Sequence, residues 1–544
     1  MKRISITILS VIALQLSALA NTVTIGDMTY ECYDDATATL TAGMAEGKAI
    51  IPAGITVDGK EYTVNVIGPR AFDHSRITSL SLPATIEKIE SGAFNYAPYI
   101  ERVDIPDLRS WLLMDFDDAA ACPTYNYTPL YVDNVLLENV VIPDGITAIG
   151  NYAFYNCSSI TDVSMGDNVT EIGDCAFDGC EQLRSATLGN GVQIIGNQAF
   201  SICVSLENIS LPDSVRQLGQ GVFYGCSSLK TVKWSSRLSF IPELTFAGCQ
   251  SLNDLSFLPE SVTAIGDYCF YFCHGLTDAT LGTGLQKLGS RTFHECQALR
   301  EVTFHNPDTK IGMYAFSCCP ALTLINLPEN MQLLSTGLLM ECTSLPSIKI
   351  PAGVTEIGDV ALANCSSLRY ISFPDGMSKI GQQAMYGCAS LRRLDFGAAV
   401  DSIKVQAFYK CPQLSEIHCH GLEPPAISFF TFDYLTEQEA LLVVPEMALD
   451  LYADNLWGWG RFTHISGNPA YNPDTMLTVL WGGKAEVKRY VAYGTRFTLR
   501  LSGPDGALPS ALFYNGTEVT DTLSPDGSFT TPPVTDSATL RIIP

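Results

Sequence analysis

The most constraining feature of this 544-residue chain is a short pattern that recurs twelve times between Ile149 and Leu414. Its consensus is Ile-Gly-x-x-Ala-Phe-x-x-Cys-x-x-Leu, and the copies follow every 23 residues except for one step of 24, from Ile241 to Ile265. A fixed period in this range indicates a solenoid, whose coils bury their apolar sides only by stacking on one another. The copies begin at Ile149, Ile172, Ile195, Leu218, Ile241, Ile265, Leu288, Ile311, Leu334, Ile357, Ile380 and Ile403.

Residues 206–228 show how one coil is expected to fold. A short strand ends at Pro212, a second short extended segment leads to Gly219, and a tight 3₁₀-like turn returns the chain to the core. Stacking then joins the apolar positions of all coils into one core, in which a column of phenylalanines supplies the bulk. The inward residues of this coil are Leu206, Ile209, Leu211, Val215, Leu218, Val222, Phe223 and Cys226.

Twelve of the eighteen cysteines occupy one position of the repeat. Equivalent residues of neighbouring coils stack at about 4.8 Å, inside the roughly 4.4–6.8 Å window between the Cα atoms of a disulfide. Stacked side chains point in parallel, however, which is poor geometry for a bond, and two earlier repeats carry Ser75 and Ala97 there. We predict buried free thiols that fill space, with some disulfides or a bound metal as the alternative. The twelve are Cys157, Cys180, Cys203, Cys226, Cys249, Cys273, Cys296, Cys319, Cys342, Cys365, Cys388 and Cys411.

The first twenty residues read as a secretory signal peptide. Lys2 and Arg3 precede an apolar stretch, and Ala18-Leu19-Ala20 forms a small-residue cleavage site. No later stretch approaches the roughly 18 apolar residues of a membrane span, so we expect an exported chain without one. A formal net charge of −25 opposes binding to nucleic acid and to anionic membrane surfaces.

The repeat resembles that of the BspA-like leucine-rich-repeat family of exported bacterial surface proteins, over roughly residues 60–466. The resemblance implies a mainly β leucine-rich-repeat solenoid at 66–466, with a longer, helix-bearing repeat at about 101–145 and a closing unit at about 415–466. It also implies adhesion at the cell surface, to host extracellular-matrix proteins for some members.

The segments on either side of the solenoid are predicted to be β-structured. Residues 21–65 alternate apolar and polar positions, as expected of strands that cap the first coil. After a linker rich in Asn and Pro, residues 467–544 lose the period and carry alternating runs and an Asn-Gly turn. This pattern favours a small, sandwich-like all-β domain.

No motif of the sequence points firmly to catalysis. His294-Glu295 begins like a zinc-protease helix but lacks the second histidine. His418 and His420 share one face of a strand as a two-ligand start of a metal site, without a clear third ligand. The acidic run 115–118 lacks the spacing of a calcium loop and reads as a solvated loop. We therefore assign no catalytic, cofactor-binding or metal-binding residue and predict that the chain is not an enzyme.

One basic island stands out on the outward side of the first strands. Alternate strand residues point outward, so equivalent positions form columns across successive coils, most of which hold small polar residues. Cationic and aromatic residues together are typical of contact hot spots, which makes the island a candidate protein-binding patch. The alternative is simple charge balance against Asp395, Asp375 and Glu356. The island consists of Lys349, Arg369, Tyr370, Arg392 and Arg393.

These observations favour a monomeric, exported binding or adhesion protein that presents an extended surface to proteins or glycans. A scaffolding role at the cell envelope is the first alternative, with residues 467–544 as the docking part. A glycan-binding accessory to polysaccharide uptake is the second, in which Trp457 and Trp459 stack on sugars if they are exposed; capping of the solenoid is the competing role for both.

Overall fold

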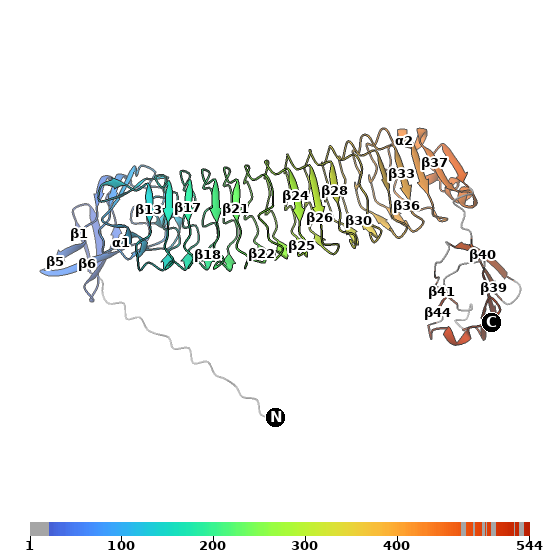
Figure 1. The fold of residues 1–544 in the computed structure, drawn as a ribbon, viewed down its shortest axis with the longest axis horizontal. Helices are drawn as coiled ribbons and strands as arrows, with labels where there is room; N and C mark the ends of the chain where they lie inside the picture. The colour runs from blue at the N-terminus through green and yellow to red at the C-terminus, as the bar shows by residue number, and fades with distance from the viewer. Residues whose placement is uncertain are drawn as a thin grey trace, which may run out of the picture. The chain divides into compact units, whose positions relative to one another are not determined.

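The computed structural model describes residues 21–468, 475–481, 485–491, 496, 498–501, 508–526, 528–532 and 538–543. The predicted signal peptide, residues 1–20, lies outside the described residues. The chain divides into two compact units: residues up to 348 with 361–366 form the first, and residues 349–360 with 367 onward form the second. Stacked coils with short parallel strands make up most of both units (Figure 1).

The first unit begins with a cap of longer strands. β1, β2 and β3 pair antiparallel, β5 forms a hairpin with β6, and parallel stacking starts where β3 pairs with β6 and β4 with β7. The strands expected over 21–65 are thus present, the last continuing to Ile67. Their bounds are β1 Asn21–Ile25, β2 Met28–Cys32, β3 Thr37–Ala42, β4 Glu46–Ile50, β5 Gly54–Val57, β6 Lys60–Ile67 and β7 Arg76–Ser81.

Each regular coil contributes two short strands that pair with the equivalent strands of its neighbours. Partners along a ladder lie 23 residues apart, as when Asn208 pairs with Thr231, and in the strands Asn208–Ser210 and Thr231–Lys233 the middle residue is buried between two exposed ones. The alternation predicted from the sequence is therefore confirmed.

In the first unit the first strands are β13 Asn139–Val141, β15 Asp162–Ser164, β17 Ser185–Thr187, β19 Asn208–Ser210, β21 Thr231–Lys233, β24 Asp278–Leu281, β26 Glu301–Phe304 and β28 Leu324–Asn326. The second strands are β14 Ala148–Ile149, β16 Glu171–Ile172, β18 Ile194–Ile195, β20 Gln217–Leu218, β22 Phe240–Ile241, β23 Ala264–Ile265, β25 Lys287–Leu288, β27 Lys310–Ile311 and β29 Leu333–Leu334.

In the second unit the first strands are β31 Tyr370–Ser372, β33 Arg393–Phe396, β35 Glu416–Cys419, β37 Leu441–Pro445 and β38 His464–Asn468. The second strands are β30 Glu356–Ile357, β32 Lys379–Ile380, β34 Ser402–Ile403 and β36 Ala426–Ile427.

The turn between coils has the i→i+3 hydrogen bonds of a 3₁₀-like turn but does not continue as a helix. Two residues per coil adopt positive φ, for example Gln198 at 53° and Ile202 at 54°. Such a conformation is rare for a β-branched residue and is usually reserved for glycine, which other coils place there. This conformation is tolerated because the N–H groups of Gln198, Phe200 and Ile202 all donate to carbonyls of the next coil. The hydrogen bonds of this ladder offset the energetic cost of the positive φ.

Phenylalanine rings and cysteine thiols fill the core beside this turn. From Phe154 to Phe316 the rings of successive coils stack with centroids 5.2–6.1 Å apart. The Phe177 carbonyl accepts the Cys180 N–H at 3.2 Å and, on its other lone pair, the Cys203 thiol at 3.2 Å. Nine further ladder thiols bond the same way, at 3.1–3.3 Å. All eighteen cysteines lie among the described residues and none forms a disulfide, which agrees with the predicted free thiols.

Irregular units occur where the sequence departs from the pattern. In the first unit the helix α1 (Leu108–Leu112), which Asp107 caps, buries Trp111, and its indole N–H donates to the Ala153 carbonyl at 2.8 Å. The remaining elements of this unit are β8 Lys88–Ile89, β9 Arg102–Ile105, β10 Asp115–Phe116, η1 Ala119–Ala121, β11 Leu130–Val132 and β12 Val135–Leu136.

The closing unit covers the last coil with aromatic residues. Trp459 is fully buried against Phe396, Phe432 and Phe462, and its indole N–H donates to the Pro425 carbonyl at 2.8 Å. Trp459 therefore has the capping role. The unit contains α2 Tyr434–Glu439, η2 Glu446–Ala448, α3 Leu449–Ala453 and η3 Trp459–Arg461, and β38 extends it to Asn468.

The C-terminal segment is a small all-β domain, as predicted. Its core contains Leu501, Leu512, Phe529, Leu540 and Ile542. The described strands are β39 Thr475–Trp481, β40 Ala485–Val491, β41 Thr498–Arg500, β42 Ala511–Tyr514, β43 Thr517–Glu518, β44 Ser528–Thr530 and β45 Ala538–Ile543, and a 3₁₀ turn spans Thr520–Thr522. Within the described parts of the chain, no helix has the length and apolar character needed to cross a membrane.

The buried thiols predict a loss of stability at alkaline pH. Burial raises the pKa of Cys226 and Cys273 to about 12, whereas an unfolded thiol titrates near 8.5. The folded state thus favours the neutral thiol, so this contribution is complete below pH about 8.5 and declines as the pH rises toward 12. Urea midpoints measured from pH 7 to 10 should fall, and replacing Cys203, Cys226 and Cys249 with alanine should flatten that fall. Rapid reaction of the native ladder with a thiol reagent would contradict the burial.

The phenylalanine column should contribute more to the free energy of unfolding than the cysteine column. Phe223→Ala removes a fully buried ring from a stack and should lower the free energy of unfolding by roughly 3–5 kcal/mol. Cys226→Ala removes one sulfur and a weak hydrogen bond and should cost only about 1 kcal/mol. Urea denaturation followed by circular dichroism compares the two; equal losses would mean that the thiol bond, not the ring stack, holds the coils.

Truncation tests the closing unit. A fragment of residues 21–414 would lose Phe432 and Trp459, which cover Phe408 and Phe396, and should aggregate because a coil edge and its rings become exposed. A fragment of residues 21–468 retains β38 and should remain soluble and folded. Light scattering after size-exclusion chromatography distinguishes them, and a monomeric 21–414 fragment would place the cap before Leu414.

Candidate functional site

The predicted basic patch centres on β31 and β33 of the second unit. The two strands pair in parallel, with Tyr370 opposite Arg393, and Arg393 is in turn opposite Glu416 of β35. Tyr370 is 44 % exposed. The structure therefore brings Tyr370 and Arg393 side by side on the outer side of the sheet, as the column argument requires.

Arg369 and Arg392 form a second column directly before these strands. The Arg369 carbonyl accepts the Arg392 N–H at 2.9 Å, so the two residues occupy the same place in adjacent coils. Both side chains are exposed, and the ion pairs found among the described residues include neither. Two exposed guanidinium groups one coil apart create a positive surface that can bind a carboxylate or sulfate in a bidentate manner.

Arg393 differs because acidic neighbours hold it. Its guanidinium lies 3.2 Å from the Asp395 carboxylate and 3.5 Å from that of Glu416. Burial alone raises the pKa of Asp395, but hydrogen bonds and charges from His420 and Arg393 outweigh it and hold this pKa below its usual range. Charge balance, the alternative explanation of the basic island, is thus present at Arg393. Of its two acidic partners, Asp395 was predicted from the sequence and Glu416 was not.

Lys349 does not share the sheet of the other patch residues. Its side chain is exposed, but residues 348–350 form no strand, and β31 is an edge of the sheet β31-β33-β35-β37-β38. The geometry therefore brings together Arg369, Tyr370, Arg392 and Arg393, whereas Lys349 stays outside that cluster.

The two histidines noted in the sequence each face a carboxylate. The Nε2 atom of His418 lies 2.6 Å from Glu416, and that of His420 lies 2.8 Å from Asp395. Among the described residues no group of three metal-ligating side chains gathers here or elsewhere. Charged residues at alternate positions of β33 and β35 were the signal in the sequence for this network, but the partners depend on the register between the coils.

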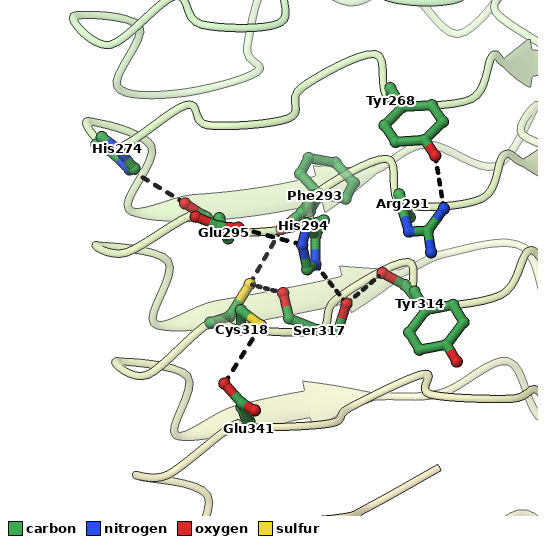
Figure 2. A network of polar contacts seen from close by, with 11 residues as sticks. Tyr268, His274, Arg291, Phe293, His294, Glu295, Tyr314, Ser317, Cys318 and Glu341 are labelled. Carbon is green, nitrogen blue, oxygen red and sulfur yellow. Dashed lines mark hydrogen bonds and ion pairs between the residues drawn. The ribbon is translucent and has the colours of Figure 1, made fainter. Parts of the chain in front are cut away.

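The His294-Glu295 motif lies on a turn of the first unit, in a network of polar contacts (Figure 2). The Nδ1 atom of His294 is 2.6 Å from the Ser317 hydroxyl, and its Nε2 atom is 3.3 Å from the Glu295 carboxylate. These are the residue types of a hydrolase triad. Ser317, however, is 0 % exposed and donates its own hydroxyl to the Tyr314 carbonyl at 2.9 Å, so a substrate cannot reach it.

The remaining members of that network also have structural partners. Arg291 reaches the Tyr268 hydroxyl at 2.5 Å, and the Cys318 sulfur lies 3.5 Å from the Glu341 carboxylate. Burial and the Glu341 charge raise the pKa of Cys318 to about 12, which keeps it a neutral thiol rather than a nucleophile. The network thus ties neighbouring turns together.

The acidic run 115–118 is bonded rather than simply solvated. Asp117 forms an ion pair with Lys88 at 2.8 Å. Asp118 caps η1 by accepting the Ala121 N–H at 2.8 Å, and also accepts from Ser91 and Gly92. These partners use the oxygens that a calcium ion would need.

Comparison with known proteins identifies the repeat. The family model of the BspA type leucine rich repeat region matches in six copies, over residues 59–112, 131–253, 240–342 and 334–431. These segments together cover more than half of the chain. A search among curated proteins found no significant match.

Solved structures of bacterial leucine-rich-repeat proteins resemble the chain. A leucine-rich repeat protein from Bacteroides ovatus shares 23 % identity over 73 % of this chain and 94 % of its own, with a TM-score of 0.46. A leucine rich cell surface protein from Faecalibacterium prausnitzii shares 21 % over 83 % and 96 %, with a TM-score of 0.29. The pneumococcal vaccine antigen PcpA shares 14 % over 83 % and 100 %, with a TM-score of 0.37.

The family match covers most of the solenoid that the 23-residue period predicted. The chain belongs to the BspA-type leucine-rich-repeat family.

Proposed function

We propose that this chain is an exported, non-enzymatic binding protein that recognises an acidic protein or glycan through the arginines before β31 and β33. The observation that carries the proposal is the pair Arg369 and Arg392, exposed and adjacent on a protein of net charge −25. Tyr370, which is partly exposed beside them, adds an aromatic surface of the kind found in hot spots. An acidic patch of a host extracellular-matrix protein fits this chemistry.

The non-enzymatic part of the proposal rests on the accessibility of the nucleophiles. The arrangement of Ser317, His294 and Glu295 buries its serine, and the partly exposed thiols of Cys175 and Cys318 have pKa values raised to about 12. A long, regular outer face, on which each coil presents its own exposed side chains, suits recognition better than catalysis.

Glycan recognition by the closing unit is a second candidate function. Trp457 is 87 % exposed, in contrast to the buried Trp459. An indole face open to solvent is suited to stacking on a sugar ring, and the exposed rings of Phe429, Phe430 and Tyr434 belong to the same unit. Trp457→Ala should then reduce binding to a polysaccharide panel without a change in stability.

The patch can be tested with a double variant and a matched control. Arg369→Ser with Arg392→Glu should weaken binding to immobilised heparin, and to any partner recovered from extracellular-matrix extracts, by at least about tenfold, equivalent to about 1.4 kcal/mol. Lost anchoring and new repulsion of an acidic partner would both contribute. Arg393 is left unchanged because its removal would take the guanidinium partner from the carboxylates of Asp395 and Glu416.

The control is Arg184→Ser with Arg300→Glu, which makes the same charge change at the same exposed repeat position in the first unit. Thermal unfolding should be nearly unchanged in both variants, since exposed substitutions usually contribute within about 0.5 kcal/mol. Equal loss of binding in the two variants would show that only overall charge matters and would refute the patch.

A further inference from the structure

The outer sheet of the first unit is interrupted at one coil. The sheet that starts at β13 ends at β21, and the next sheet begins at β24, two coils later. The intervening residues 252–258 form no strand, and Figure 1 shows the chain passing between β21 and β24 without an arrow on that side. This segment therefore leaves β21 without a neighbouring strand on one of its edges.

A cavity of about 550 Å³ opens where the strand is missing. Lys230 and Thr231 line it from the side of β21, and Asn253, Asp254 and Phe257 line it from the side of the segment. The volume falls within the roughly 300–1,000 Å³ range of ligand sites. The cavity is therefore large enough to hold a small molecule or one part of a larger one.

Two backbone groups at this cavity have no partner among the described residues. In the coils on either side, the Glu207 carbonyl accepts the Lys230 N–H at 2.8 Å, and the Asn253 carbonyl accepts the Thr277 N–H at 3.2 Å. Between these two bonds the ladder is broken, since no hydrogen bond of the described chain involves the Lys230 carbonyl or the Asn253 N–H. Hydroxyl groups of a ligand, which both donate and accept, can satisfy both groups.

The side chains of the segment add further hydrogen-bonding groups that the protein leaves unused. The Asn253 side chain is exposed, and its amide has no hydrogen-bond partner within the described chain. The Oδ1 atom of Asp254 accepts the Ser256 N–H at 2.8 Å, whereas no described residue donates to its Oδ2 atom. An amide and a carboxylate oxygen on adjacent residues can bond to neighbouring hydroxyls of one ligand.

Phe257 supplies an aromatic surface beside these polar groups. Its ring lies 5.5 Å from that of Phe246 and 6.4 Å from that of Trp234, and both of these residues are buried. Phe257 itself is half-buried and lines the cavity. Its contacts with the core hold the ring in place, and a fixed aromatic ring is suited to packing against the apolar CH groups of a sugar ring.

The charges of the lining favour a neutral ligand. The Lys230 Nζ atom lies 3.0 Å from the Glu207 carboxylate, so this ammonium group is already paired. The Asp254 carboxylate and the net charge of −25 repel an acidic ligand. An ammonium group carries donors but no acceptor, so it cannot satisfy the Asn253 N–H. A neutral compound rich in hydroxyl groups meets all of these conditions.

We propose that this cavity binds a neutral saccharide, whose hydroxyls bond to the Lys230 carbonyl, to the Asn253 N–H and to the side chains of Asn253 and Asp254. One sugar ring packs against Phe257. The site lies in the first unit and rests neither on the arginine patch nor on Trp457 of the second unit. It thus adds a neutral glycan to the acidic partner proposed above.

Defined trisaccharides test the site on the whole mature chain. The neutral probes are maltotriose, cellotriose, mannotriose and tri-N-acetylchitotriose, and the acidic comparison is trigalacturonic acid. Ligand-observed NMR should detect binding of at least one neutral probe at millimolar concentration and no binding of the acidic one, because Asp254 repels its carboxylates. If no neutral probe binds, or if the acidic one binds as well as the best neutral one, the proposal is wrong.

A matched pair of asparagine variants places the bound saccharide. Asn253→Ala should weaken binding of the best neutral probe at least about tenfold, because the amide that bonds to its hydroxyls is lost. The control is Asn326→Ala, an exposed asparagine of β28 outside the cavity, which should change binding less than about twofold. Thermal unfolding should be nearly unchanged in both, since both side chains are exposed. Equal binding by the two variants would overturn the site.

Two further variants separate this site from the surfaces of the second unit. Phe257→Leu keeps an apolar side chain against Phe246 but removes the aromatic ring, and should weaken the saccharide at least about threefold. Trp457→Ala and the arginine-patch variant should both leave trisaccharide binding unchanged. Binding that is lost in Trp457→Ala and retained in Asn253→Ala would place the glycan on the closing unit and refute the cavity, so each proposal fails by a different result.

Discussion

The interaction on which the rest of the structure depends is the backbone ladder between equivalent residues of successive coils. It runs through both short strands and through the turn, where Gln198, Phe200 and Ile202 donate to the next coil. The ladder sets the spacing of the coils, and that spacing sets the distance between stacked rings. Even left-handed residues such as Ile202 are held by it, because leaving a buried N–H without an acceptor would cost more than the strained backbone.

The choice of cysteine at one position follows from the same ladder. A phenylalanine carbonyl already accepts one N–H within its own coil and has a second lone pair facing the next coil. A thiol is small enough to fit beside the ring stack and can donate weakly to that lone pair. Alanine, as at Ala97, fits the space but cannot donate, and among the described residues the buried Ser75 hydroxyl has no hydrogen-bond partner. Burial then keeps the thiols neutral and unreactive, without any disulfide.

Functional surfaces on such a scaffold arise where exposed side chains line up in columns. The arginine patch is of this kind: Arg369 and Arg392 are neighbours only because 23 residues make one coil. Residues 252–258 and 348–350 form no first strand, although only the first of these two segments lies at the 24-residue step.

The sequence alone determined the repeat, the core columns, the outward columns and the two end caps, because period and polarity are local properties that every coil repeats. It also indicated which residues of the basic island are neighbours, except for Lys349, whose segment does not form the expected strand. Only the tertiary structure decided that Arg393 is held by Asp395 and Glu416, that His418 and His420 face carboxylates, and that Trp459 is buried while Trp457 is exposed. It likewise decided that residues 252–258 form no strand. These outcomes depend on side-chain packing and hydrogen bonding between coils, and the spacing of a single repeat encodes neither.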